Sequence, residues 1–371
     1  MRTYMLLALL ALAVTVLFVP IVRRAALVFG ALTPVRTRDV HTRPIPRLGG
    51  VAMLLGFAVA IVFASSTSYL SRLFVDPQGW TILIGGVAIC LLGVIDDLWE
   101  LDWWAKLAGQ MLIAGSVTWG GVQMVSVPVF GMTVGSVRLG IILTVLVTVV
   151  AINAVNFVDG LDGLAAGTVG IGGLAFFLYS YLLIRLSNSQ SYASLAALEM
   201  AIMVGICAGF LVFNFHPASI FMGDSGSMLL GYLTAVAFIT VTGQINPELL
   251  GRSQILPALL PILLPLAVLL LPLLDTIMAV SRRLLAGESP FHPDRMHLHH
   301  RLLALGHSHS RAVLIMYLWA AAFALPAVAL IALPAFEVLI GFLVAIVVSV
   351  LITVIALPGL RRRGHALEKH Q

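Results

Sequence analysis

Charged side chains are scarce in this sequence: Asp, Glu, Lys and Arg make up 10% of its 371 residues, whereas hydrophobic residues make up 60%. A mean hydropathy of +1.07 indicates a membrane protein rather than a soluble domain. The two cysteines, Cys90 and Cys207, lie far apart within apolar segments, which argues against a cysteine metal site. The sequence also lacks a convincing internal repeat, which weakens the case for the repeated architecture of many transporters.

Eleven apolar segments are long enough to cross a bilayer, for which a helix needs about 20 residues. The longest stretches between them, 23–47 and 282–311, leave no room for a separate soluble domain. The sequence therefore predicts one integral membrane domain over residues 1–371, all-α, with about 11 transmembrane helices. Residues 122–137 alternate Val with other residues and predict a small β-hairpin. The expected spans are 4–22, 48–65, 80–95, 103–120, 139–155, 164–185, 195–213, 220–242, 255–281, 312–332 and 335–357.

The distribution of Lys and Arg predicts the orientation of the chain. An odd number of spans puts the termini on opposite sides, and sixteen of the 21 Lys and Arg then map to one side. The positive-inside rule makes that side cytoplasmic, with the N-terminus and the hairpin outside and the C-terminus in the cytoplasm. The net charge of +5 reflects this topology and attraction to anionic lipid, so no nucleic-acid partner is expected.

The few polar side chains gather in four clusters, all of which map to the predicted cytoplasmic side. Ionisable residues in or beside a bilayer are costly, so they indicate function by default. A membrane protein that collects carboxylates and imidazoles at one interface is expected to bind a polar, charged substrate. The clusters are Asp96-Asp97, NAVNFVDGLDG at 153–163, MGDSG at 222–226 and HPDRMHLHHR at 292–301.

Asp96 and Asp97 end the third predicted span, next to tryptophans typical of a membrane interface. Adjacent helical residues point about 100° apart, so the two carboxylates are expected to have different roles. Carboxylates at a helix C-terminus oppose the helix dipole, which favours a functional interpretation over a solvated helix end. Lys106, just inside the next span, can snorkel to the interface or bind an anionic headgroup beside the acids.

The run at 153–163 places an Asn or Asp at every third position. Such positions drift around the axis of a straight helix, and the two glycines of the run favour a helix break. We expect the helix to end near Asn156 and a tight loop to carry Asp159 and Asp162. The alternative is an ordinary capping loop, because Asn, Asp and Gly are common turn residues.

Asp224 lies between two glycines that permit close approach of a ligand to the backbone. A hard cation such as Mg²⁺ prefers carboxylates, water and substrate phosphates, and Asp224 with a neutral Asn oxygen would suit it. The alternative is a helix N-cap. Phe221 either packs in the core or stacks on a base, and its position alone favours the core.

The run at 292–301 mixes His and Arg in one loop. A zinc site is the obvious alternative, but the HEXXH spacing is absent and no cysteine is near. Arg and His together suit an anion better, through charge-assisted hydrogen bonds to phosphate. A merely solvated loop is the remaining alternative.

Together these motifs resemble the polyprenyl-phosphate N-acetylhexosamine-1-phosphate transferase family, which joins a sugar-1-phosphate from a UDP-sugar to a membrane polyprenyl phosphate and releases UMP. The resemblance runs from PRLGG at 46–50 to the histidine loop, with the Asp-Asp pair, NxxNxxDGxDG, FMGDSG and HLHHR in the expected order. The HLHHR form and the uninterrupted stretch from Asp97 to Lys106 are similar to the bacterial undecaprenyl-phosphate N-acetylglucosamine-1-phosphate transferase branch, and less so to the muramoyl-pentapeptide branch.

The resemblance implies a site on the cytoplasmic face of the inner membrane that uses Mg²⁺, or Mn²⁺ in its place. Asp224 would be the principal metal ligand with Asn156 as the second, and Phe221 would stack on uracil. The loop from Arg43 to Arg47 would close over the nucleotide, and Asp275 ranks below the others. The residues implied in catalysis are Asp96, Asp97, Lys106, Asp159 and His297, and those implied in substrate binding are Arg47, Asp162, Phe221, Arg295, His299, His300 and Arg301.

The implied activity is transfer of N-acetylglucosamine-1-phosphate, or a related sugar phosphate, to undecaprenyl phosphate as the first membrane step of a cell-envelope glycan. The implied partners are UDP-N-acetylglucosamine, undecaprenyl phosphate, the bilayer and a second copy of the chain in a homodimer. The alternatives are transfer of phospho-muramoyl-pentapeptide, a transporter and a non-catalytic lipid-binding scaffold. A transporter would place ionisable residues near the midplane, where the sequence offers only Glu199 and Glu337 deep in predicted spans.

Overall fold

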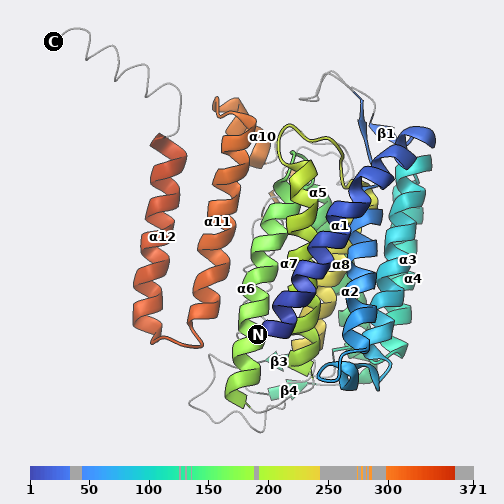
Figure 1. The fold of residues 1–371 in the computed structure, drawn as a ribbon. Coiled ribbons are helices and arrows are strands. Elements are labelled where there is room, and N and C mark those ends of the chain that lie inside the picture. The colour runs from blue at the N-terminus through green and yellow to red at the C-terminus, as the bar shows by residue number, and fades with distance from the viewer. Residues whose placement is uncertain are drawn as a thin grey trace, which may run out of the picture.

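The chain forms a bundle of long helices that run roughly side by side (Figure 1). The computed structural model describes residues 1–33, 44–124, 127–129, 132–134, 136–187, 192–242 and 298–355, with scattered positions between 274 and 285. Eight described helices are long and apolar enough to cross a membrane. They are α1 (Arg2–Val28), α3 (Gln78–Trp99), α5 (Val137–Val158), α6 (Leu164–Ser187), α7 (Tyr192–Asn214), α8 (Gly223–Thr242), α11 (His309–Ala329) and α12 (Ala335–Ile355).

The remaining described elements are short. They are the helices α2 (Gly49–Ser65), α4 (Trp103–Trp119) and α10 (Leu298–Ala304), the 3-10 helix η1 (Ser71–Phe74), and the strands β1 (Leu32–Thr33), β2 (Ile45–Pro46), β3 (Val127–Val129) and β4 (Met132–Val134). The all-α membrane fold is thereby confirmed, and so is the small hairpin, in which β3 pairs antiparallel with β4. Ten of the expected spans correspond to α1–α8, α11 and α12, whereas the expected span 255–281 lies mostly outside the described residues.

Several helices extend beyond their predicted ends, and in α3 and α5 the extension brings acidic residues into or next to helical structure. α3 continues through Asp96 and Asp97 to Trp99, and Glu100 then ends it in the left-handed conformation (φ 47°). α5 continues past Asn156 to Val158, because Val158 is buried and the glycine-containing turn begins only after Asp159. The helix thus ends two residues after Asn156, as expected, and Asn156 lies in its last turn.

α8 is the central helix, and nearly all of its residues are buried. It packs against α2, α3, α5 and α7, while α1 lies across α7 and α2. α11 packs on α6, and α12 packs on α11 at the edge of the bundle, as Figure 1 shows. The amino end of α8 therefore lies among the ends of several other helices, where polar side chains from distant parts of the sequence can meet.

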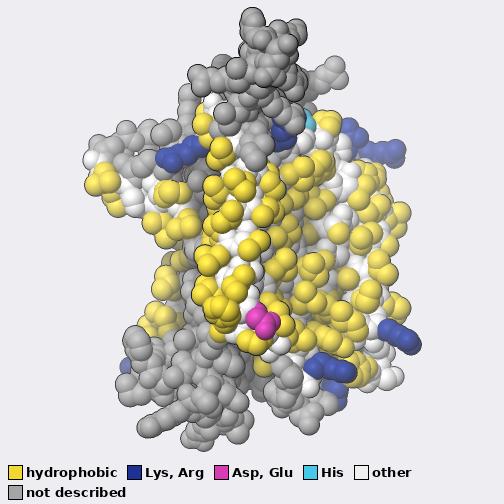
Figure 2. All heavy atoms as spheres, turned by 90° about the vertical axis from the view of Figure 1, so that its left-hand side faces the viewer, with side chains coloured by type: hydrophobic (Ala, Val, Ile, Leu, Met, Phe, Trp, Pro, Cys, Tyr) yellow, Lys and Arg dark blue, Asp and Glu magenta, His cyan; other side chains and the backbone are white. Residues whose placement is uncertain are grey.

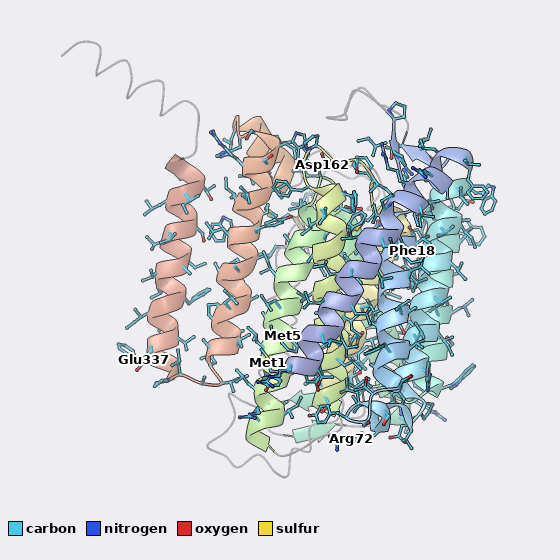
Figure 3. The ribbon with its side chains drawn as sticks, in the orientation of Figure 1. Met1, Met5, Phe18, Arg72, Asp162 and Glu337 are labelled. Carbon is cyan, nitrogen blue, oxygen red and sulfur yellow. The ribbon has the colours of Figure 1, made fainter. Side chains whose placement is uncertain are left out.

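The exposed surface of the bundle is apolar. Figure 2 shows one face covered with hydrophobic side chains over its middle, with Lys and Arg gathered toward the two ends. Glu337, which the sequence placed deep in a span, is instead an exposed residue in the first turn of α12 (Figure 3). The expectation that Glu337 lies deep in a span was therefore wrong: the helix begins at Ala335, where the expected span also begins, and its first turn holds this carboxylate.

Glycine allows α3 to approach the start of α8 closely. A Cβ atom added to Gly93 in α3 would lie 2.6 Å from the carbonyl carbon of Asp224 in α8. No real Cβ tolerates such a distance to backbone, so a side chain here must push the two helices apart. Gly115 in α4 has no atom within 4 Å of its virtual Cβ and offers a matched control.

We expect Gly93→Ala to destabilise the protein by about 1–3 kcal/mol, because it forces apart two packed backbones. Gly115→Ala should be neutral or stabilising by up to about 1 kcal/mol, because alanine is the better helix former. Thermal unfolding of both variants in the same detergent measures the difference. Equal melting temperatures for the two variants would contradict the close approach of α3 and α8.

Candidate active site

Asp97 binds the amino end of α8. Its Oδ1 accepts a hydrogen bond from the backbone N–H of Asp224 at 3.0 Å, and its Oδ2 accepts one from Ser225 at 3.1 Å. The first N–H groups of a helix have no partner within the helix, and the helix dipole favours a negative charge there. The carboxylate of Asp97 is buried at 8% exposure, so it acts on this helix end rather than on solvent.

Asp96, the neighbouring residue, points elsewhere and contacts Lys106. The Oδ1 atom of Asp96 accepts a hydrogen bond from the backbone N–H of Leu101 at 2.8 Å, and its Oδ2 lies 3.0 Å from the Lys106 ammonium. The same ammonium also forms an ion pair with Oδ2 of Asp224. Lys106 thus joins the end of α3 to the start of α8, and the two adjacent aspartates have different contacts, as their angular separation on a helix predicts.

Asn156 fixes the other oxygen of Asp224. Its Nδ2 donates to Oδ1 of Asp224 at 2.9 Å and to the hydroxyl of Ser227 at 2.8 Å. Asn153, one turn earlier in α5, donates to Oε1 of Gln110 at 2.7 Å and to the carbonyl of Val149. Asn156 therefore belongs to the carboxylate cluster, whereas Asn153 holds α5 against α4.

Asp159 follows the last residue of α5 and lies close to the cluster. Burial, followed by the negative charges of Asp224 and Asp97, raises the pKa of Asp159 to about 8, and the nearby Arg47 guanidinium opposes this shift. At neutral pH in the absence of a cation, Asp159 is therefore mostly protonated. The cluster carries more carboxylates than its described cations neutralise, which is the electrostatic condition for binding a further cation.

Asp162 lies in a hydrogen-bonded clamp with two histidines. Its Oδ2 accepts from the backbone N–H of Ala218 at 3.1 Å and lies 2.7 Å from Nδ1 of His216. Its own backbone N–H donates to Nε2 of His309 at 3.0 Å. The side chain of Asp162 is only 3% exposed, and its Oδ1 has no hydrogen-bond partner among the described residues.

The same three side chains offer ligand atoms within 4.8 Å of one another, a spacing compatible with a metal ion. The orientation of the two imidazole rings argues against a metal ion at this position. The imidazoles of His216 and His309 are stacked, with centroids 4.2 Å apart and planes at 15°, so their in-plane lone pairs do not converge on a shared point. In addition, Nε2 of His309 already accepts the N–H of Asp162. The group is therefore a structural clamp between the 159–163 loop, the 215–219 loop and α11.

The segment that contains PRLGG pairs with the segment that contains FMGDSG. The backbone N–H of Phe221 donates to the carbonyl of Pro46 at 2.8 Å, and that of Gly49 donates to the carbonyl of Phe221 at 3.0 Å. Arg47, which lies between Pro46 and Gly49 in the sequence, donates from Nε to the hydroxyl of Thr33 at 2.8 Å. β1 and β2 thereby hold Arg47 and the partly exposed Phe221 at the site end of the bundle.

The structure thus brings Asp96, Asp97, Lys106, Asn156, Asp159 and Asp224 together, and places Asp162, Arg47 and Phe221 at the same end. Figure 3 shows Asp162 and Arg72 at opposite ends of the bundle. Arg43, Asp275, Arg295 and His297 lie outside the described residues, and so do the side chains of His299 and His300, whose backbone is helical in α10. Arg301 is an exposed residue of α10. The chemical roles of all these residues stay predictions.

Four polar residues that support the site were not singled out from the sequence: Gln110, Asn214, His216 and Ser227. Asn214 accepts from the N–H of Gly163 at 3.0 Å and donates to the carbonyl of Ile220 at 2.9 Å, so it joins two site loops. Asn214 and His216 occur in NFHPAS, directly before FMGDSG. Their position next to that motif could have identified Asn214 and His216 from the sequence. No sequence feature identifies Gln110 or Ser227, because each looks like an isolated polar residue in a helix.

We expect Asp159→Asn to change how stability depends on pH. Without divalent cation, the folded protein keeps the Asp159 proton up to about pH 8, whereas the unfolded chain loses it near the ordinary value of 3.8. The stability contributed by this proton is therefore lost as pH rises through that window. The free energy of unfolding of the wild type should fall more between about pH 5 and about pH 8 than that of Asp159→Asn, which has no proton to release. Identical pH profiles from chemical unfolding would contradict the raised pKa.

The chain is similar in sequence to known transferases. The profile of glycosyl transferase family 4 matches residues 80–242, which include most of the polar cluster. The chain is 43% identical over 348 residues to the decaprenyl-phosphate N-acetylglucosaminephosphotransferase of Mycolicibacterium smegmatis, covering 92% of this chain and 85% of that protein. It is 33% identical to the probable undecaprenyl-phosphate N-acetylglucosaminyl 1-phosphate transferase of Bacillus subtilis, covering 85% of this chain and 82% of that protein.

A more distant relative is the phospho-N-acetylmuramoyl-pentapeptide-transferase of Shouchella clausii, at 32% identity over 83% of this chain and 90% of that protein. Identity over nearly the whole chain, together with a carboxylate cluster at one end of an apolar helix bundle, identifies the family. The chain belongs to glycosyl transferase family 4 and, within it, to the polyprenyl-phosphate N-acetylhexosamine-1-phosphate transferases.

Proposed function

We propose that this membrane transferase moves N-acetylglucosamine-1-phosphate from UDP-N-acetylglucosamine to a polyprenyl phosphate, giving polyprenyl-diphospho-N-acetylglucosamine and UMP. The observation that carries the proposal is the convergence of Asp96, Asn156 and Asp224, with Lys106, from four helices at one end of the bundle. A lipid phosphate can reach such a site from the bilayer surface, and a sugar nucleotide can reach it from the aqueous side. The positive-inside rule makes that side the cytoplasm and supports location in the inner membrane.

The residues present fit a divalent cation. Oδ2 of Asp96 and Oδ2 of Asp224 contact the same ammonium group, so one small cation can meet both oxygens. Carboxylate oxygens at a partly hydrated site are the ligands that Mg²⁺ prefers. Asn156 would ligate through its amide oxygen, which requires its side chain to turn away from the present Nδ2 contact with Asp224. When bound, Mg²⁺ would neutralise charge on the diphosphate of the donor.

In the proposed reaction, an oxygen of the lipid phosphate attacks the β-phosphorus of the donor. The bond from that phosphorus to the bridging oxygen breaks, and the electron pair leaves with UMP. Phosphoryl transfer depends mainly on positioning and charge neutralisation. The lipid phosphate has a second pKa near about 6, so a general base is helpful but not required. Lys106 would donate to the anionic phosphates, and Asp96 would orient the lipid phosphate.

The nucleotide would bind at the loops that Asp162 and Phe221 reach. Oδ1 of Asp162 is a buried acceptor without a hydrogen-bond partner among the described residues, so the loops around it would have to open for it to accept from the N–H edge of uracil. The clamp from His216 and Ala218 fixes the direction of this carboxylate. Phe221 is partly exposed beside the same loops and supports stacking on the base. The homodimer and the phosphate-binding role of the histidine loop remain predictions.

A transporter is the rival function, and the described residues do not favour it. Glu199 in α7 is buried, and neither of its oxygens has a hydrogen-bond partner in the described part of the chain. Glu337, the other candidate, is exposed in the first turn of α12. A single buried carboxylate does not form the paired midplane site that transport of a charged solute requires. The ionisable residues gather at the end of the bundle instead.

We expect Asp96→Asn and Asp97→Asn to lower turnover for different reasons, while both keep binding the UDP-sugar. Asp97→Asn replaces one acceptor at the start of α8 with an amide donor, so it should also cost about 1–3 kcal/mol of stability. Asp96→Asn keeps an oxygen for Leu101 and should leave stability nearly unchanged. UMP release, donor binding by calorimetry and thermal unfolding distinguish the two effects. Full activity in both variants would refute the role of the pair.

A donor and acceptor panel tests the substrate assignment. Purified protein should release UMP only when a divalent cation, UDP-N-acetylglucosamine and a polyprenyl phosphate are all present. UDP-sugars that differ at C2 and C4, and UDP-muramoyl-pentapeptide, should be poorer donors, and decaprenyl phosphate can be compared with undecaprenyl phosphate as acceptor. Preference for the muramoyl donor would overturn the proposed sugar, and solute movement in proteoliposomes without UMP release would favour transport.

A further inference from the structure

Lys106 occupies an unusual position in the carboxylate cluster. Within the described ranges, it is the only Lys or Arg with an ion pair to Asp96 or Asp224. The other oxygen of each carboxylate is already used, that of Asp96 by the N–H of Leu101 and that of Asp224 by Asn156. The ammonium of Lys106 therefore binds one remaining oxygen of each carboxylate, at the point where the Asp96 and Asp224 side chains also meet each other.

A divalent cation would need those same two oxygens. Two positive ions cannot share them at contact distance, because their mutual repulsion is strong where water is partly excluded. Lysine carries a compact charge on a flexible four-carbon chain, so its ammonium can move while its backbone stays in α4. The side chains of Lys106 and Asp224 are 17% and 27% exposed, so this part of the cluster is reached by solvent.

The ion pairs of Lys106 are not needed to hold the helices together. The same ends of α3 and α8 are already joined by the two hydrogen bonds from Asp97 to the amino end of α8. They are also in direct backbone contact at Gly93. Because α3 and α8 keep these contacts when the ammonium leaves, displacement of Lys106 requires no rearrangement of the fold.

We propose that Lys106 is a displaceable counter-ion: in the free protein its ammonium fills the divalent-cation position, and cation binding releases it to bind the lipid phosphate. This inference rests on the proposed function for the identity of the phosphate ligand. It has two consequences. The free protein binds a divalent cation more weakly than its carboxylates alone would, and the cation and the phosphate strengthen each other's binding.

Lysine labelling tests the displacement in the wild-type protein. The sequence has only two lysines, Lys106 and Lys369, so Lys369 serves as the internal control. Purified protein in lipid nanodiscs is treated with a dilute acetylating reagent, with and without Mn²⁺ and without any substrate, and acetylation is measured by mass spectrometry. We expect Mn²⁺ to increase acetylation of Lys106 several-fold and leave that of Lys369 unchanged. Unchanged or reduced acetylation of Lys106 at saturating Mn²⁺ would overturn the proposal.

Direct binding of Mn²⁺, followed by the paramagnetic resonance signal of the free ion, tests the competition. Lys106→Gln should bind Mn²⁺ at least about tenfold more tightly than the wild type, which corresponds to about 1.4 kcal/mol. Lys106→Arg retains the charge and should show no such gain. Arg72→Gln removes a cation at the opposite end of the bundle, where Arg72 lies over the ring of Tyr69, and should also show none. A folded Lys106→Gln with unchanged or weaker Mn²⁺ binding would overturn the competition.

The coupling to phosphate is tested with farnesyl phosphate as a short lipid probe. In the wild type, Mn²⁺ should raise the affinity for this probe, whereas in Lys106→Gln the gain should be largely lost. Equal gains in both proteins would overturn the release step. These measurements use no sugar nucleotide and are therefore independent of the UMP-release assay. If the cation and the probe bind as expected but the donor and acceptor panel gives no UMP, the proposed function is refuted and the counter-ion role stands. If UMP is released but Mn²⁺ leaves Lys106 labelling unchanged, the counter-ion role is refuted and the proposed function stands.

Discussion

The amino end of α8 is bound by a carboxylate from another helix, and the geometry of the site depends on this contact. Both oxygens of Asp97 accept hydrogen bonds from the first backbone N–H groups of α8. Unpaired N–H groups at a helix start are costly when buried, and α8 is buried along nearly its whole length. The contact therefore satisfies the helix and also fixes Asp224, the second residue of α8, in the centre of the cluster. Asp96, Lys106 and Asn156 are arranged around a carboxylate whose position Asp97 determines.

Within the carboxylate cluster, Asp96, Asp97, Asp159 and Asp224 outnumber the two cations that the described residues place beside them, Lys106 and Arg47. The protein limits the cost in three ways: Asp97 accepts two hydrogen bonds from the start of α8, Asp159 holds a proton through its raised pKa, and Lys106 is shared by two carboxylates. The excess that remains is the physical reason for proposing that the site binds a cation and, through it, an anionic substrate. A site built from apolar residues would avoid the cost but would have no means of binding a diphosphate beside a bilayer.

Much of the site could be predicted from sequence because charge is rare in this chain. In a protein that is 60% hydrophobic, each Asp or Asn at the end of a span is informative, and the motifs around Asp96, Asn156 and Asp224 were found in this way. Helix geometry also predicted that Asp96 and Asp97 have different contacts. The partner of Asp97 could not be predicted, because the contact joins residues 127 positions apart and depends on how α3 packs against α8. Nor could the clamp of Asp162 by His216 and His309, since α6 and α11 meet only in the folded bundle.

The sequence alone determined that the chain crosses a membrane, that its polar motifs occur at helix ends, and that these ends share one side. Those properties depend on local composition and on the alternation of spans, which the order of residues specifies directly. Only the tertiary structure decided which carboxylate positions a helix, which one pairs with Lys106 and which oxygens remain for a cation. Whether a hydrogen bond forms depends on differences of a few tenths of an ångström in the distance between elements far apart in sequence. Packing of α8 against α2, α3 and α5 sets those distances.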